Sequence, residues 1–146
     1  MDTGNLVQLF YGFEGRINRA KYWLAVGVFL AIAIVLTLLA IMLGLGVDVE
    51  DLAETSLSVI VIAIIVYIPM LIAGIAVGMK RLHDRNKSGW WLVLFYAAPA
   101  LLSWLGGENM ILSLVSFIIS IWAIVELGFL RGTPGANSYG PDPLNL

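Results

Sequence analysis

Four apolar runs alternate with short polar segments along this chain of 146 residues. The runs cover approximately residues 22–44, 57–79, 90–105 and 110–130. An α-helix needs about 20 apolar residues to cross a hydrocarbon core about 30 Å thick, and the first, second and fourth runs meet this length. The third run is shorter and contains Pro99, so its length is at the limit for a span. The pattern predicts a single membrane domain over residues 1–146, an all-α integral membrane protein with four transmembrane helices.

The spacing of small residues indicates how these helices pack. The connection from Gly106 to Asn109 is short, so the fourth run is predicted to return antiparallel beside the third. Small residues let another helix approach closely, and Gly74 and Gly78 provide them near the end of the second run. Pro69 removes one backbone donor from the same run and is expected to bend it. One helical face of the fourth run carries Ser113, Ser116, Ser120, Ala123 and Leu127.

The two ends of the chain differ from the apolar runs. Before the first run, apolar residues recur at helical steps opposite charged ones, which predicts a short helix in the membrane interface. These apolar residues are Leu6, Leu9, Phe10, Phe13 and Ile17. Gly12 and Gly15 weaken the helix, so a bent or broken segment is the alternative. Residues 131–146 are rich in Gly, Pro and Asn and predict a tail made of turns.

Charge predicts how the helices cross the membrane. The chain has eight Lys and Arg residues, confined to three places. These are Arg16, Arg19 and Lys21 before the first run, Lys80, Arg81, Arg85 and Lys87 between the second and third, and Arg131 after the fourth. The segment 44–54 and the turn at Glu108 contain acidic residues and no cation. Under the positive-inside rule both termini and the central loop are cytoplasmic, and four spans satisfy this parity.

Composition narrows the function classes. Hydrophobic residues make up 60% of the chain and charged residues 12%, which is too apolar for an ordinary water-soluble domain. There is no cysteine, so disulfides, thiolate nucleophiles and Cys-ligated metals are excluded. The single histidine cannot form a metal site by itself. We therefore predict no catalytic residue, no metal, no cofactor and no nucleic-acid partner.

The segment between the second and third runs, residues 80–91, concentrates the polar chemistry. It contains four cations, the only histidine and two tryptophans. If the second helix continues one turn further, Arg81 and Arg85 project together while Asp84 pairs with one cation. Trp90 then lies at the level of an aromatic belt. Guanidinium groups there suit anionic phospholipid head groups. The alternative is that these cations only fix the orientation of the protein in the membrane.

Two further residues have competing interpretations. His83 is adjacent to Asp84, but neighbours on a helix point about 100° apart, so a helix-capping histidine is favoured over an acid–base pair. Glu126 lies inside the fourth run near its cytoplasmic end. Pairing with Arg131 or with an arginine of the first basic cluster is the favoured interpretation. A proton or cation site at Glu126 is the alternative.

Three separated segments together resemble a known family. Residues 13–23 match F-x-G-R-x-x-R-x-x-Y/F-W, residues 80–91 contain R-L-H-D-x-x-x-S-G-W-W, and residues 132–143 match G-x-x-G-x-N-x-Y-G-x-D-P. The chain thus resembles the domain of unknown function 805 family of small bacterial inner-membrane proteins over essentially its whole length. The resemblance implies a bacterial inner-membrane location and a four-helix membrane domain, without an established activity. Ser138 departs from the family pattern, where Arg is frequent.

All three segments fall on the predicted cytoplasmic side, and we expect them to meet there. The expected cationic cluster consists of Arg16, Arg19, Arg81 and Arg85, with Asp84, Glu126 and Asp142 as counter-charges. The turn Tyr139–Gly140–Pro141 is expected to dock over this cluster against Trp90. Together with His83, these residues form the predicted binding site.

Three functions compete for such a site. The first is a non-catalytic module that binds anionic membrane phospholipid or a partner protein through the cytoplasmic cluster. The second is a small oligomeric transporter or channel subunit, with the serine face of the fourth run or Glu126 lining a path. The third is a membrane enzyme that acts on a lipid head group, with His83 and Asp84 in its site.

Overall fold

The computed structural model describes residues 6–44, 57–106 and 109–144, and in this part of the chain the regular structure is helical apart from one isolated β-bridge. The α-helices are α1 (Leu6–Tyr11), α2 (Arg19–Met42), α3 (Leu57–Asp84), α4 (Ala98–Gly106) and α5 (Met110–Ile124). Two π-helical segments adjoin them, η1 (Val93–Ala97) before α4 and η2 (Val125–Phe129) after α5. The acidic segment 45–56 and Glu108 lie outside the described residues.

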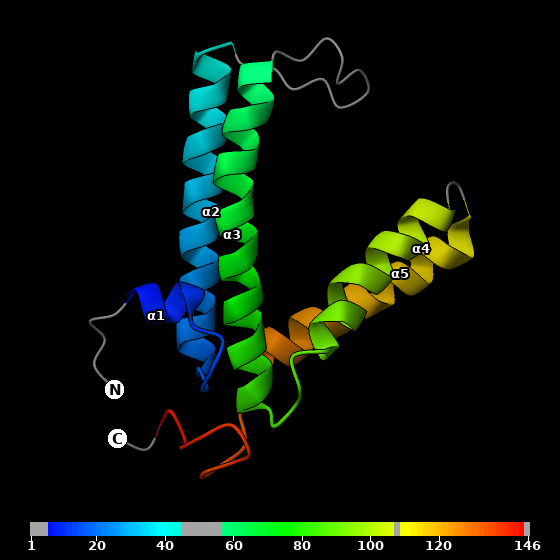
Figure 1. Ribbon diagram of the computed structural model, residues 1–146. Coiled ribbons are helices and arrows are strands. Elements are labelled where there is room, and N and C mark those ends of the chain that lie inside the picture. The colour runs from blue at the N-terminus through cyan, green and yellow to red at the C-terminus, as the bar shows by residue number, and fades with distance from the viewer. Residues whose placement is uncertain (1–5, 45–56, 107–108, 145–146) are drawn as a thin grey trace.

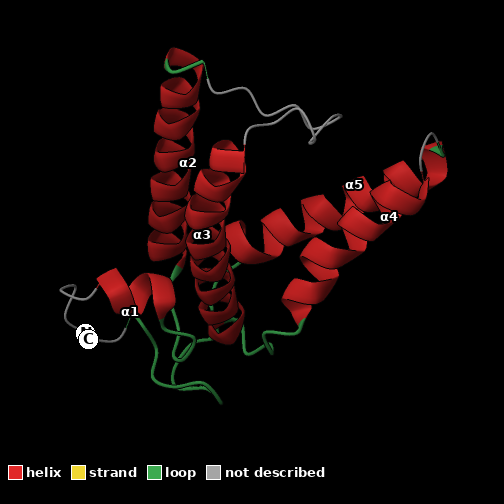
Figure 2. Cartoon of the chain, turned by 45° about the horizontal axis from the view of Figure 1, so that its top comes forward, coloured by secondary structure: helices red, strands yellow, loops and turns green. Residues whose placement is uncertain are grey.

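The helices form two hairpins that meet at one end and diverge at the other (Figure 1). One hairpin pairs α2 with α3, and the second pairs η1 and α4 with α5. The hairpins join where η2 contacts both α2 and α3. Figure 2 shows α1 and most of the loops drawn in green at this junction end.

The helix lengths agree with a membrane protein. Three helices are long and apolar enough to cross a membrane, namely Arg19–Met42, Val59–Asp84 and Met110–Phe129. The third predicted span corresponds to the shorter apolar helix Val93–Gly106. The predicted boundaries differ most in α3, which continues through Pro69 and past residue 79 as far as Asp84. The last turn of α3 is stabilised by residues from other segments, because Arg16 donates to the Asp84 carboxylate and Thr133 donates to the Asp84 carbonyl.

Most of the buried apolar side chains in the described residues lie in two clusters at the junction. Leu82, Leu92, Phe95, Ala123 and Leu127 form one buried cluster there. A second consists of Ile17, Ala25 and Val77. Further along the hairpins, large apolar side chains such as Leu38 and Ile65 are exposed. This distribution suits helices whose outer surfaces contact hydrocarbon rather than water.

The second hairpin confirms the predicted antiparallel return (Figure 1). Asn109 caps the start of α5 by accepting hydrogen bonds from Ile111 N and Leu112 N. Ser116 Oγ lies 3.3 Å from Ser103 Oγ and donates to Pro99 O at 3.2 Å. These bonds satisfy the serine hydroxyls inside the hairpin. Of the predicted small-residue face, Ser116, Ala123 and Leu127 are buried, whereas Ser113 is exposed.

The amino-terminal segment takes the broken form. Helix α1 ends at Tyr11, and Gly15 has a positive φ of 84°, which a continuous helix cannot contain. The prediction of one helix through Ile17 is therefore wrong. Lys80 holds the separate α1 against α3, because its Nζ donates to Gln8 O at 2.7 Å and to Leu9 O at 2.5 Å.

Close contact between the hairpins depends on Gly128. Trp23 Nε1 donates to Gly128 O at 2.9 Å, and a Cβ on Gly128 would lie 2.6 Å from the Trp23 ring. We expect Gly128→Ala to destabilise the protein by about 1–3 kcal/mol, because the indole must move. Unfolding of the purified protein in detergent, followed by tryptophan fluorescence, measures this loss.

Gly27→Ala is the matched control for this variant. A Cβ on Gly27 meets nothing within 4 Å, and the residue lies inside α2. Alanine is favoured over glycine in a helix interior by about 0.5–1 kcal/mol, so stability should be unchanged or slightly higher. Equal losses in both variants would contradict the proposed contact.

Candidate functional site

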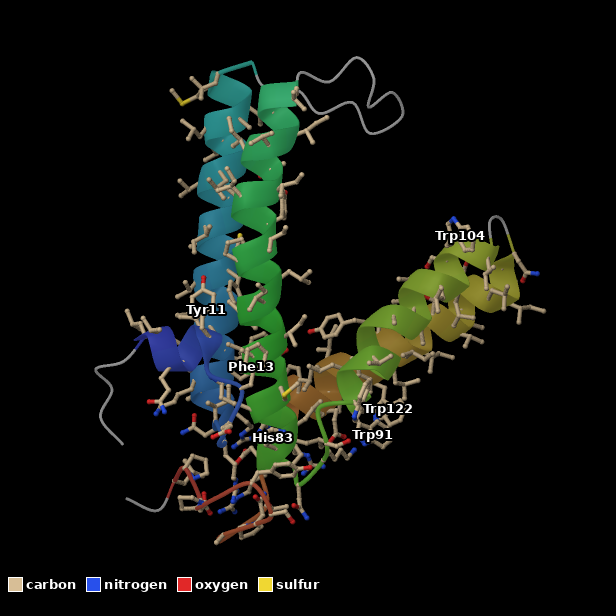
Figure 3. The ribbon with its side chains drawn as sticks, viewed as in Figure 1. Tyr11, Phe13, His83, Trp91, Trp104 and Trp122 are labelled. Atoms are coloured by element: carbon tan, nitrogen blue, oxygen red, sulfur yellow. The ribbon has the colours of Figure 1, made fainter. Side chains whose placement is uncertain are left out.

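The polar side chains of the three sequence segments gather at the junction end (Figure 3). The first segment, residues 13–23, covers the loop before α2 and the first residues of α2. The second, residues 80–91, covers the last turn of α3 and the following loop, and the third, residues 132–143, lies in the carboxy-terminal tail after η2. The structure thus brings together residues far apart in sequence. Arg16, for example, contacts Asp84 and Gly140.

Asp84 lies at the centre of this site, between two guanidinium groups. Arg16 Nε and Nη2 donate to Asp84 Oδ1 at 3.2 and 3.0 Å. Arg81 Nη1 donates to Asp84 Oδ2 at 2.5 Å. The exposed fractions of the Arg16, Arg81 and Asp84 side chains are only 1%, 0% and 3%. We call these three residues the Asp84 cluster.

The Asp84 cluster has two positive charges and one negative charge, and backbone carbonyls provide the remaining stabilisation. Arg16 donates to the carbonyls of Gly135 at 2.7 Å, Gly140 at 3.2 Å and Thr133 at 2.7 Å. Burying a charge is costly unless it is paired and hydrogen-bonded, and these acceptors meet that requirement.

Arg81 uses its remaining donors at the end of the second hairpin. Its Nε donates to Leu127 O at 2.7 Å, and its Nη2 donates to Leu130 O. Arg19 Nη1 similarly donates to Phe129 O at 3.1 Å. Carbonyls at a helix carboxyl end lack helical partners and carry partial negative charge, so cations there are favourable. Both arginines therefore attach η2 to the first hairpin.

The carboxy-terminal tail closes the end of α3. Thr133 donates to Asp84 O through its backbone N at 2.8 Å and its Oγ1 at 3.0 Å. Asn137 Nδ2 donates to His83 O at 2.9 Å. A Cβ on Gly132 would lie 2.1 Å from Asp84 Oδ2, so only glycine fits beside the immobilised carboxylate.

His83 and Tyr139 correct two predictions. Their rings stack with centroids 3.9 Å apart and an interplanar angle of 5°, and His83 Nδ1 donates to Gly15 O at 3.2 Å. Tyr139 thus docks on His83 and not on Trp90, which is 81% exposed. His83 does not cap the helix, because tail residues donate to the last carbonyls of α3 and place Tyr139 over the imidazole.

Glu126 pairs neither with Arg131 nor with an arginine of the first basic cluster, but it does pair with Arg85 of the expected cationic cluster. Its Oε1 accepts from Arg85 Nε at 2.9 Å and lies 3.0 Å from Lys87 Nζ. Arg131 is not a partner because its segment is extended beyond η2, where its carbonyl accepts from Arg85 Nη1. Lys87 also lies over the Trp91 ring, 4.6 Å from its centroid. The pairing anchors the loop after α3 to η2.

Asp142 stabilises the tail itself. Its carboxylate accepts from Leu144 N at 3.0 Å and Gly135 N at 2.9 Å. The hydrogen bond from Leu144 N, together with that from Gly135 N, lowers the pKa of the Asp142 carboxyl below its usual range. Asp142 therefore braces a turn, and no ion pair between it and an arginine is present among the described side chains.

Sequence reasoning omitted several residues that complete this site. Thr133 and Asn137 bind the end of α3, Gly132 makes room for Asp84, and Lys87 shares Glu126. The sequence did point to these residues, since Gly132, Thr133 and Asn137 belong to the third motif segment, residues 132–143. Their partners are about 50 residues away in sequence, so the pattern alone did not reveal what they bind.

The geometry distinguishes buried cations from cations with exposed surface. Arg16 and Arg81 use the donors of their guanidinium groups within the chain. The cations with exposed or partly exposed surface are Arg19, Lys21, Arg85, Lys87 and Arg131, and of these Arg19, Arg85 and Lys87 also have partners within the chain. Within the described ranges, no three His, Asp or Glu side chains gather as a metal-binding group.

Replacing Asp84 should reveal the role of the Asp84 cluster. Asp84→Asn keeps the size of the side chain but leaves two buried guanidinium groups without a carboxylate. We expect a loss of about 3–5 kcal/mol in the free energy of unfolding, as for other broken buried ion pairs. Unfolding in detergent at neutral pH measures it.

Glu126→Gln is the comparison, because its cationic partners Arg85 and Lys87 retain side-chain exposures of 24% and 26%. Water can solvate them, so the loss should be clearly smaller. An Asp84→Asn variant as stable as the original chain would show that Asp84 does not hold the segments together.

Comparison with known proteins finds related sequences. The chain is 30% identical to "Uncharacterized protein YiiR" of Escherichia coli strain K12, an alignment covering 92% of this chain and 88% of the relative. It is also 30% identical to "Inner membrane protein YhaH" of the same organism, with the same coverage of both chains. "Inner membrane protein YhaI" is 25% identical, covering 95% of this chain and 92% of the relative. No solved structure matches significantly.

A family model supports the same relationship over a continuous region. The model described as "Protein of unknown function (DUF805)" matches residues 10–141. This region contains the first two sequence segments, the third as far as Pro141, and the Asp84 cluster. The chain therefore belongs to the family described as protein of unknown function DUF805.

Proposed function

We propose that this protein is a non-catalytic, multi-pass protein of the bacterial inner membrane that binds anionic phospholipid at its cytoplasmic end. The observation that carries this proposal is an excess of positive charge at the junction end. Eight Lys and Arg side chains and four carboxylates are described there, an excess of four positive charges. Anionic head groups are the counter-charges that a membrane supplies.

The Asp84 cluster has a structural role in this proposal. Arg16 and Arg81 are occupied, so they position the tail and the second hairpin without touching lipid. Lipid contact is assigned to the accessible cations, with Trp90 beside them at the interface. We define these as the cationic rim: Arg19, Lys21, Arg85, Lys87 and Arg131.

The proposed topology has four crossings with both termini in the cytoplasm. Helix α1 and the tail lie at the same end of the molecule, which supports an even number of crossings (Figure 1). Segments η1 and α4, of five and nine residues, together give about 21 Å of helix and lie beside α5. A hairpin of this kind enters and leaves on the same side.

Cysteine labelling tests the orientation, because the chain contains no cysteine. Ser138 is exposed in the tail, and Met110 is exposed at the start of α5. On intact cells stripped of their outer membrane, a membrane-impermeant maleimide should label Met110→Cys. It should label Ser138→Cys only after the inner membrane is permeabilised. The reverse pattern would contradict the proposed topology.

Neutralising part of the cationic rim tests lipid binding. Neither the Lys21 nor the Arg131 side chain belongs to an ion pair of the described structure, so their loss leaves the fold intact. We expect Lys21→Gln with Arg131→Gln to weaken binding to phosphatidylglycerol vesicles by about 1 kcal/mol per cation, or roughly 30-fold together. The difference should shrink in high salt. Liposome co-flotation or fluorescence titration measures it.

Glu14→Gln is the control of opposite sign. Glu14 is an exposed carboxylate in the same region, and its loss increases the positive excess. Binding to phosphatidylglycerol should therefore be unchanged or tighter. If the double variant bound phosphatidylglycerol as tightly as the original chain, the proposed role of the rim would be wrong.

A further inference from the structure

A cavity lies between the two hairpins, just above their junction. Its volume is about 850 Å³, within the ~300–1,000 Å³ typical of small-molecule sites. One wall is α3, with Met70, Gly74 and Met79, and the other includes Val93 and Tyr96 of the second hairpin. The two hairpins diverge above it (Figures 1 and 2), which would place its open side in the hydrocarbon of a membrane.

One end of this cavity is polar. His83, Ser88 and Tyr139 line it there, beside the exposed Trp90. Figure 3 places His83 at the junction end, below the diverging hairpins. The hydroxyls of Ser88 and Tyr139 can donate to a phosphate oxygen. Ser88 directly follows Lys87 of the cationic rim. The cavity therefore combines an apolar wall with a polar end next to positive charge.

We propose that this cavity binds one acyl chain of an anionic phospholipid, with the phosphate held at the end formed by His83, Ser88 and Tyr139. This inference rests on the proposed function and gives the lipid a defined position. The acyl chain of the lipid lies along α3, from the junction past Gly74. Its head group lies at the end of the molecule that has the positive excess.

Charge favours a lipid over a second copy of the chain as the occupant. In one membrane a second copy has the same orientation, so its positive end would lie beside this one. Like charges at such an interface oppose association. An anionic lipid brings the opposite charge to the same position. Its acyl chain gains little by leaving other lipid tails, so the head group determines which lipid class binds.

Gly74 allows the cavity to be filled without disturbing the protein. A Cβ on Gly74 meets nothing within 4 Å, so the side chain of Gly74→Leu extends into the cavity. Gly27→Leu is the matched control, because Gly27 also meets nothing within 4 Å but lies on α2, away from the cavity. Val93→Trp fills the cavity from the opposite wall and provides a second variant.

The experiment measures lipid binding by native mass spectrometry of protein released from detergent micelles. Phosphatidylglycerol and phosphatidylethanolamine with identical chains are titrated separately. The original chain and Gly27→Leu should each bind one phosphatidylglycerol. Half-saturation should need about tenfold less phosphatidylglycerol than phosphatidylethanolamine. In Gly74→Leu and Val93→Trp this preferred binding should weaken about tenfold while thermal stability stays unchanged. Glycerol 1-phosphate alone should not compete.

The other outcomes separate the two proposals. Without a preference for phosphatidylglycerol in the original chain, the proposed function fails. If the preference exists but Gly74→Leu and Val93→Trp retain it, only the cavity assignment fails and the lipid is annular. Competition by glycerol 1-phosphate would indicate a free phosphate site instead. Loss of a dimer in Gly74→Leu would identify a second copy as the occupant and overturn the inference.

Discussion

The structure depends on one carboxylate shared by two buried arginines. Asp84 is the last residue of α3, and Arg16 precedes α2. Arg81 lies in α3 but donates to carbonyls that follow α5. The three charged side chains therefore connect different parts of the chain. No member can be buried alone, because an unpaired charge away from water costs several kcal/mol. The Asp84 cluster therefore couples the amino-terminal segment, both hairpins and the tail into one unit.

This arrangement explains why the rest of the molecule is open. Because polar contacts join the hairpins at one end, their apolar lengths need not pack against each other, and they diverge (Figure 1). The divergence leaves an apolar cavity above a polar end containing His83 and Tyr139. Buried and exposed cations consequently differ in their surroundings: Arg16 and Arg81 are enclosed in the junction, whereas Lys21 and Arg131 retain exposed surface.

Much of this architecture was predictable because membrane solvation acts on local patterns. An apolar run of sufficient length must form a helix in hydrocarbon, and a short turn makes the next helix antiparallel. The clustering of cations similarly predicted that residues around Arg16 and Arg81 share one end. Motif matches also identified the family. The predictable features are those that depend on neighbours in sequence or on the membrane.

The chain pattern by itself thus determined an all-helical membrane protein, its approximate helices and the segments that contain its polar chemistry. Only the tertiary structure decided the partners: Asp84 with two arginines, Glu126 with Arg85 and Lys87, and Tyr139 on His83. Those pairings join residues that are mostly more than 40 positions apart. Apart from the pair of Arg81 and Asp84, which lie three residues apart on α3, spacing along a helix cannot specify them, because they depend on where two independent hairpins and a folded tail come to rest.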